Sequence, residues 1–325
     1  MNSISGYQLG AMLVIADVFG LFCTGGNISL MTLYGALAAA AFQFLLALIF
    51  IIHGGGSSRL KKLIFAVYTL FSGGVVFSSL WRTHEVIYIP YEDGSGIWGR
   101  VLTAGLIAAV CIYGSSTGIR AVSRAAVVIA AAGALCILID FSSAAFNAEW
   151  ENISRPEMSG FVYEFMRGNA LSGGIGSFFV LLDKTKGERF RTAVVYFGAR
   201  AVLTAVVLLT ALSVAGGIVT VTDFPVITAA QLSQPFEAQR IDSLFLVVFI
   251  AFAVFSVTLH IMTAAHILKE LFPSFLRYRS STAAAVVIGT ALLISGRELI
   301  LLRAAAAIGV LIIAEIKRSA VNVSG

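Results

Sequence analysis

The sequence predicts an all-α integral membrane protein with about ten transmembrane helices, arranged as a 5+5 inverted repeat with interrupted helices 1 and 6. Three observations predict this class. Of the 325 residues, 58% are hydrophobic and only 12% are charged, whereas a soluble domain carries about 25% charged residues. The apolar residues gather in ten stretches that are long enough to be transmembrane spans. Glycines and polar residues interrupt two of these stretches, and the two occupy corresponding places in the halves of the chain.

The ten apolar stretches each approach the roughly 20 residues that a helix needs to cross a bilayer. They form one transmembrane domain over residues 1–325, with no large soluble part between them. Only the short segment Ser-Gly-Arg-Glu divides the last two. The predicted spans lie near 7–24, 30–52, 62–81, 99–116, 122–141, 159–182, 190–218, 242–268, 281–296 and 299–316.

Basic residues indicate how these spans are oriented. If the N-terminus is cytoplasmic, most Lys and Arg residues outside the spans fall in cytoplasmic segments, as the positive-inside rule requires. We therefore predict that both termini are cytoplasmic. The first basic residue is Arg59, so the basic region of a cleavable signal peptide is missing and the first span is expected to remain in the mature protein. The outer segment 219–241, which contains two prolines, is either a short helical cap or a plain loop.

The sequence carries no enzymatic, nucleic-acid-binding or metal-binding motif, so we expect a protein that is not an enzyme and needs no cofactor or metal. Cys23, Cys111 and Cys136 lie in apolar stretches without a paired Cys or His. They are interpreted as small buried apolar residues. The expected contacts are membrane lipid and a small solute, with no nucleic acid.

The two interrupted spans contain "DVFGLFCTGGN" (17–27) and "RGNALSGGIGSFF" (167–179). Dividing the spans into repeats of about 7–141 and 159–316 makes span 1 correspond to span 6, and five spans per half give the halves opposite orientations. Paired breaks in inverted halves are typical of a binding site near the bilayer midplane. The alternative is that the small residues serve only close helix packing. Because the breaks are matched, we favour binding.

The breaks at 20–26 and 168–176 are expected to face one another around a central pocket. Free amides there suit a carboxylate, unwound carbonyls suit an ammonium group, and glycine backbone leaves space for the ligand. Spans 3 and 8 complete the pocket. The predicted ligand-binding residues are Gly20, Leu21, Phe22, Cys23 and Thr24 in span 1, Ser72 and Gly73 in span 3, Asn169, Ser172, Gly173, Gly174 and Gly176 in span 6, and Ser256 and Thr258 in span 8.

Ionisable residues within spans are costly and often functional. Asp17 lies just before the first break and either binds a cation or proton or hydrogen-bonds a neighbouring helix. Glu164 and Arg167 have the i,i+3 spacing of a local ion pair, for which we favour a structural role. Arg200 needs an interior partner that the sequence does not identify. A lone intramembrane His260 more often has a structural role than a ligand-binding one.

Three segments resemble one known family. They are "ISGYQLGAMLVIADVFG" (4–20), "GIRAVSRAAVV" (118–128) and "FPVITAAQLSQPFEAQRIDSLFLVVFIAF" (224–252), the last with a Phe-Pro start and an Arg-hydrophobic-Asp motif at the head of span 8. In these features the chain resembles the spore-germination permeases. These are the integral-membrane B subunits of germinant receptors, which are related to amino acid–polyamine–organocation transporters. Two features depart from that family: Thr-Gly-Gly replaces the usual proline-containing end of span 1, and Gly-Ser stands where a Gly-Glu-like pair is common in span 6.

The resemblance implies a germinant-receptor subunit that binds a small nutrient such as an amino acid at mid-membrane and helps to trigger spore germination. It also implies partner A-type and lipoprotein C-type subunits in the spore inner membrane. Three alternatives stay open. The first is a secondary amino-acid transporter of a bacterial cell membrane. The second is a ligand-gated ion-conducting subunit, and the third is a structural subunit that does not bind ligand.

Overall fold

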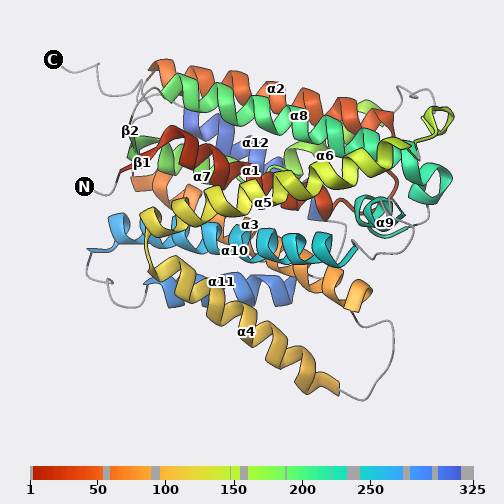
Figure 1. Ribbon diagram of the computed structural model, residues 1–325. Helices are drawn as coiled ribbons and strands as arrows, with labels where there is room; N and C mark the ends of the chain where they lie inside the picture. The colour runs from red at the N-terminus through yellow and green to blue at the C-terminus, as the bar shows by residue number, and fades with distance from the viewer. Residues whose placement is uncertain are drawn as a thin grey trace.

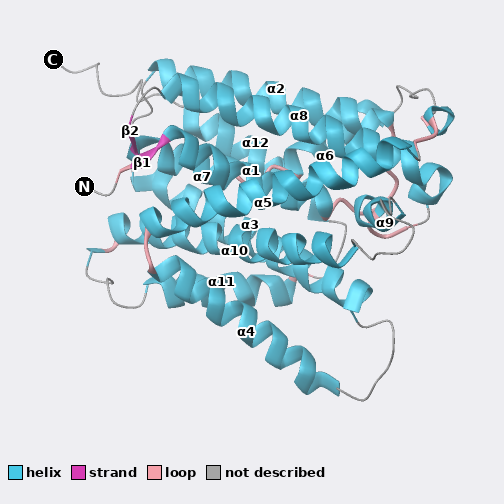
Figure 2. Ribbon diagram, viewed as in Figure 1, coloured by secondary structure: helices cyan, strands magenta, loops and turns pink. Residues whose placement is uncertain are grey.

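The computed structural model describes residues 3–53, 59–88, 96–146, 148–153, 160–186, 189–220, 222–232, 242–273, 279–294 and 299–315. These residues are almost entirely helical (Figure 2). The only sheet among them consists of two strands of two residues each, β1 (Ile4–Ser5) and β2 (Thr185–Lys186), which pair in parallel. The chain is therefore an all-α membrane protein, as predicted.

All ten predicted spans fall on helices (Figure 1). Span 6 is formed by two helices, α6 and α7, and an additional short helix, α9, lies between spans 7 and 8. Short 3-10 turns occur at Trp150–Asn152, Leu182–Lys184 and Gly216–Thr220. The helices are α1 (Gly6–Phe22), α2 (Leu30–His53), α3 (Arg59–Tyr88), α4 (Gly96–Ser116), α5 (Ile119–Phe146), α6 (Phe161–Ala170), α7 (Ile175–Leu181), α8 (Arg189–Ala215), α9 (Pro225–Leu232), α10 (Asp242–Leu271), α11 (Arg279–Leu293) and α12 (Leu299–Glu315).

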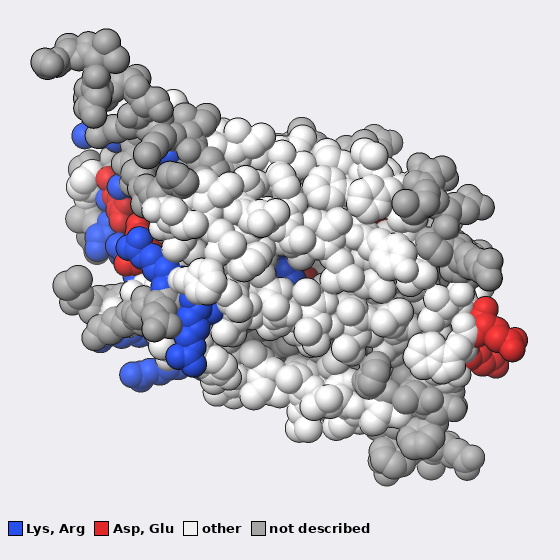
Figure 3. All heavy atoms as spheres, turned by 90° about the horizontal axis from the view of Figure 1, so that it is seen from above, with Lys and Arg blue, Asp and Glu red and all other residues white. Residues whose placement is uncertain are grey.

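The surface is that expected of a membrane protein. Five of the described helices, α2, α3, α5, α8 and α10, are long and apolar enough to cross a bilayer. Figure 3 shows most basic side chains at one end of the molecule, with some acidic ones among them, an acidic patch at the other end and a largely uncharged surface between them. This separation fits the positive-inside rule, which places the basic end in the cytoplasm. That orientation remains a prediction.

Helix α1 is at the centre of the fold. Its side chains are buried almost continuously from Leu9 to Phe22, and it packs against α5, α8 and α10. In Figure 1, α2 and α8 lie together on one side of α1, while α3 and α10 lie on the other. Corresponding spans of the two halves thus pack against each other, α2 with α8 and α3 with α10, as an interlocked inverted repeat requires. The repeat boundaries near 7–141 and 159–316 remain a prediction.

The start of α1 is fixed by local chemistry. The Ser5 hydroxyl accepts a hydrogen bond from the Gln8 amide at 3.2 Å, and the Gln8 side-chain oxygen accepts one from the Ser5 amide at 3.0 Å. This reciprocal capping box satisfies two amides that the helix itself leaves free. Immediately before it, β1 pairs with β2, so Ile4 and Ser5 are tied to the segment that follows α7.

The two predicted breaks have different forms. Span 6 is interrupted at 171–174 between two helical halves, as predicted. Span 1 leaves the helix at Phe22, also where a break was expected, but it does not resume as a second half-helix. Residues 23–29 are non-helical and lead directly into α2, so the span predicted over 7–24 ends early. Gly26 has a φ of 81°, which favours glycine and cannot continue a right-handed helix.

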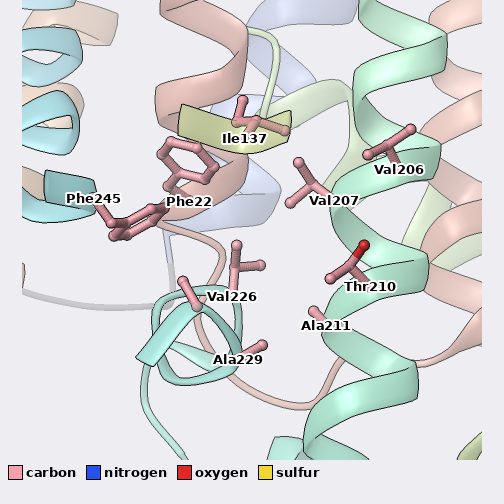
Figure 4. Close-up of a pocket in the computed structure, with 10 residues that line it drawn as sticks. Phe22, Ile137, Val206, Val207, Thr210, Ala211, Val226, Ala229 and Phe245 are labelled. Carbon is pink, nitrogen blue, oxygen red and sulfur yellow. The ribbon is translucent and has the colours of Figure 1, made fainter. Parts of the chain in front are cut away.

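The outer segment between spans 7 and 8 contains helix α9, so its described part takes the helical alternative. Pro225 begins this helix, where its missing amide hydrogen costs nothing. Figure 4 shows Val226 and Ala229 of α9 at an apolar pocket that Phe22, Val207 and Phe245 also line. The second proline of the segment, the Arg-hydrophobic-Asp motif before α10 and the 295–298 divider lie wholly or partly outside the described residues.

Candidate functional site

The interrupted span 6 meets α1 at close range. The Gly174 amide donates a hydrogen bond to the Asp17 carboxylate at 2.8 Å. A Cβ atom added to Gly20 would lie only 2.5 Å from the Leu171 carbonyl oxygen, so α1 touches the non-helical backbone of the break. These contacts place the helical part of α1 against the break in span 6. That the two breaks face one another around a central pocket remains a prediction.

On one side of the break, Asp17 is fully paired. Besides the Gly174 amide, its carboxylate accepts a hydrogen bond from the Tyr196 hydroxyl at 2.6 Å, and the Arg200 Nε lies 3.5 Å from it. Asp17 and Arg200 are only 5% and 6% exposed. Buried charges are tolerated when they are paired and hydrogen-bonded. The geometry therefore fits the hydrogen-bonding alternative for Asp17 and supplies the interior partner that Arg200 needs.

Arg200 extends this pairing to span 2 and span 6. Its guanidinium donates to the Gln43 side-chain oxygen and, at 3.0 Å, to the Ser172 hydroxyl. Ser172 also donates to Gln43 at 2.9 Å, and the Gln43 amide donates to Asn169 at 2.9 Å. We call Asp17, Gln43, Asn169, Ser172, Tyr196 and Arg200 the Asp17 network. It joins four helices and the break.

Arg167 holds the non-helical end of span 1. It pairs with Glu164 at 3.2 Å, which confirms the ion pair expected from their spacing. The same guanidinium donates to the carbonyl oxygens of Gly25 and Asn27, each at 2.7 Å. Arg167 thus satisfies backbone groups that lost their helical partners, a structural role like the one favoured from the sequence.

On the opposite side of the break, several buried polar atoms have no hydrogen-bond partner among the described residues. They are the Tyr68 hydroxyl, the Ser72 hydroxyl, the His260 Nε2, and the Nε and Nη2 of Arg303. All four side chains are buried, with exposures between 0% and 7%. Leaving such groups unpaired costs free energy, so each requires an explanation. We call these four residues the Arg303 cluster.

The Arg303 cluster gathers next to the same break. A Cβ atom on Gly176 would lie 2.7 Å from the Tyr68 ring, and one on Gly73 would lie 3.0 Å from the His260 Cβ. The Arg303 charge acts on both Tyr68 and His260. Side chains from α3, α10 and α12 therefore converge beside α7. Unpartnered polar groups that converge in this way are typical of a site that a ligand completes.

Several residues predicted from the sequence lie at this cluster. Ser72 belongs to it, Gly73 and Gly176 pack against His260 and Tyr68, and the Arg303 charge acts on Cys23. The Ser256 carbonyl accepts a hydrogen bond from His260 Nδ1 at 2.7 Å. Their part in ligand binding remains a prediction.

Other predicted residues lie elsewhere. Asn169 and Ser172 belong to the Asp17 network, and Leu21 lines a small cavity with Asp17 and Arg200. Three more face other surroundings: Phe22 lines the apolar pocket beside α9, the Thr24 hydroxyl donates to the Gly20 carbonyl at 3.4 Å, and Thr258 lies against Gly114 of α4.

Gly173 and Gly174 were expected to lack side chains so that a ligand has room. That expectation is wrong, because side chains at these two positions would point at α1 and not into a ligand site. A Cβ on Gly173 would lie 3.1 Å from the Ala16 carbonyl oxygen, and one on Gly174 would lie 3.0 Å from that of Leu13. The backbone of α1 fills this space. These two glycines therefore permit close approach of α1, which is the packing alternative.

Sequence reasoning did not select Tyr68, Arg303 or Gln43. Gln43 and Arg303 each carried a signal, because each is a polar residue within an otherwise apolar stretch, "AAAAFQFLLAL" and "LILLRAAAAIG". Tyr68 carried no signal, since tyrosine is common in membrane helices.

No protein-family model matches the sequence, and no curated protein matches it. Among solved structures, the chain is similar to Mhp1, a nucleobase-cation-symport-1 family transporter, in a closed conformation with bromovinylhydantoin bound. That match has a TM-score of 0.61 and 13% identity over 97% of this chain and 78% of the other. The inward-facing conformation of Mhp1 gives a TM-score of 0.56 and 14% identity over 96% and 76%. At these identities the likeness shows the fold alone: the chain shares the fold of Mhp1. It does not single out germinant receptors.

Proposed function

We propose that the chain is a solute transporter that binds a small molecule between the Arg303 cluster and the interrupted span 6. The observation that carries this proposal is the set of buried, unpartnered polar atoms on Tyr68, Ser72, His260 and Arg303. A ligand that pairs with them would offset the cost of their burial. The transporter fold independently supports the proposal.

The same geometry suits alternating access. The break separates α6 from α7, so the two halves of span 6 need not move as one rigid helix. The β1–β2 pairing ties the start of α1 to the segment after α7, so these two elements are expected to move together. A ligand shifts such an equilibrium only if it binds one state better than the other.

The test is uptake by the full chain in proteoliposomes. We expect a labelled solute to accumulate under an imposed ion gradient and Tyr68→Phe, which removes one cluster hydroxyl, to reduce uptake. Tyr113→Phe is the matched control, because the Tyr113 side chain is 72% exposed and belongs to neither network. Equal uptake by vesicles with and without the protein, across a broad panel of small solutes, would contradict the proposal.

The second candidate is a B-type subunit of a germinant receptor, which the resemblance of 4–20, 118–128 and 224–252 favours. In this function the site senses a nutrient, such as an amino acid, in the spore inner membrane, and A-type and lipoprotein C-type subunits are its partners. Deleting the gene from a spore-forming host should then block nutrient-triggered germination while growth on the same nutrient persists. Normal germination would exclude it. Ligand binding without uptake would instead indicate a receptor or ion-conducting subunit.

A further inference from the structure

We infer that the ligand is a small organic carboxylate of net negative charge and that Arg303 is the cation that binds it. This inference rests on the proposed function, because it names the class of solute that the Arg303 cluster would take.

The argument begins with the charge of Arg303. A guanidinium stays protonated in proteins, so Arg303 brings a full positive charge into an apolar span while only 7% exposed. The two nitrogens without a partner among the described residues, Nε and Nη2, form one edge of the guanidinium. Two parallel N–H groups on one edge match the two oxygens of a carboxylate. The empty edge thus has the geometry of a bidentate carboxylate site.

The surroundings of Arg303 favour an anion over a zwitterion. Asp17 is the acidic residue whose charge acts on Arg303, yet both of its oxygens are already engaged by Gly174, Tyr196 and Arg200. Among the described residues of the cluster there is no carboxylate for a ligand ammonium group. A net anion would balance Arg303, whereas an amino acid would add a cation that has no acidic partner. This conclusion differs from the amino acid that the family resemblance implies.

The other three residues of the Arg303 cluster indicate which further contacts the ligand makes. The hydroxyls of Tyr68 and Ser72, which also interact with each other, can donate to a carboxylate oxygen beside the Arg303 edge. His260 Nδ1 donates a hydrogen bond to the Ser256 carbonyl oxygen at 2.7 Å, and the ring also interacts with the Gly173 backbone of the break. His260 therefore borders the site, while Arg303 and the two hydroxyls supply its contacts to the carboxylate.

The experiment compares acids with their own amides, using thermal stabilisation and equilibrium binding of the purified full chain. The probes are acetate, lactate, 2-hydroxy-4-methylpentanoate and phenylacetate, each beside its uncharged amide, with alanine and leucine as zwitterions of matched skeleton. A ligand that binds the folded state raises the unfolding temperature. We expect at least one acid to stabilise the protein, its amide to have no effect, and lactate or the longer hydroxy acid to exceed the matched amino acid. The same measurements in buffers with sulfate in place of chloride show whether the stabilisation comes from the acid or from chloride bound at the site.

Variants test the assigned residue. Arg303→Gln should weaken binding of the acid by roughly 30-fold or more, the loss typical of removing one partner from a buried charged pair. Tyr68→Phe, which keeps the ring and its packing, should weaken binding less than Arg303→Gln does. It tests the same site if the arginine variant fails to fold. Stabilisation by amides as strong as by acids, by chloride alone, or by no acid at all would overturn the inference. Uptake of uncharged solutes would overturn it as well while leaving the proposed transport function standing.

Discussion

The two sides of the break in span 6 differ in how their buried polar groups are paired. On the side of the Asp17 network, an acid, an arginine, a tyrosine and three neutral polar residues pair with one another or with backbone. On the side of the Arg303 cluster, an arginine, a tyrosine, a serine and a histidine leave polar atoms without partners among the described residues. Similar residue types are therefore paired in the Asp17 network and unpaired in the Arg303 cluster.

This difference separates a structural role from a binding role. A completed network gains nothing from a ligand, and it fixes α1 and α8 against the break. An incomplete cluster is costly to the empty protein and becomes favourable only when something pairs with it. The Asp17 network is thus expected to govern stability, whereas the Arg303 cluster is expected to govern binding.

The largest expected effect is the loss of stability on breaking the Asp17 network. Asp17→Ala would leave the buried Arg200 guanidinium and the Tyr196 hydroxyl without their shared partner. Removing one partner of a buried pair costs about 3–5 kcal/mol of unfolding free energy. Thermal unfolding in detergent should show a large decrease for this variant.

Asp183→Asn is the matched control for that change. Asp183 pairs with Arg189 at 3.1 Å, but the two side chains are 54% and 47% exposed. Exposed pairs contribute about 1 kcal/mol or less, so this variant should unfold almost as the wild type does. An Asp17→Ala protein that keeps full stability but loses ion-driven uptake would show instead that Asp17 is a coupling site.

The next effect concerns the close approach of α1 to the break. Gly20→Ala would place a methyl group against the Leu171 carbonyl oxygen, and overpacking of this kind costs about 1–3 kcal/mol. Gly10→Ala lies in the same helix, where an added Cβ would meet no atom within 4 Å. That variant should be neutral or gain up to about 1 kcal/mol from better helix propensity. Equal unfolding temperatures for the two variants would contradict the described packing.

These packing relations separate what could be predicted from the sequence from what could not. Apolar length located the helices of all ten predicted spans, and the glycine-rich run in span 6 located its interruption. The sequence did not show that residues 23–29 run straight into α2, because Thr-Gly-Gly is equally compatible with a break and with a helix end. It also did not reveal that Gly173 and Gly174 face α1, or that the Arg303 charge acts on Tyr68. Those facts depend on how helices distant in sequence rotate against each other, and the pattern within one helix does not encode that rotation.

The smallest expected effect is at the polar end of the molecule. Glu270 of α10 lies 2.8 Å from Lys62, 3.5 Å from Lys184 and 3.3 Å from His266, and its side chain is 34% exposed. Because water screens these charges, Glu270→Gln should cost about 1 kcal/mol or less. A loss as large as that of Asp17→Ala would show that pairing at this end, and not only at the break, holds the helices together.

The most direct test of the difference between the paired Asp17 network and the unpaired Arg303 cluster is the stability of Arg303→Met in the absence of ligand. Methionine preserves an unbranched chain of similar size but removes the unpaired charge. We predict that the empty variant unfolds at the same or a higher temperature than the wild type, and that it neither binds nor transports the solute. An unfolding temperature lowered as far as that of Asp17→Ala would mean that Arg303 is paired within the protein. That result would contradict the assignment of the Arg303 cluster as the binding site.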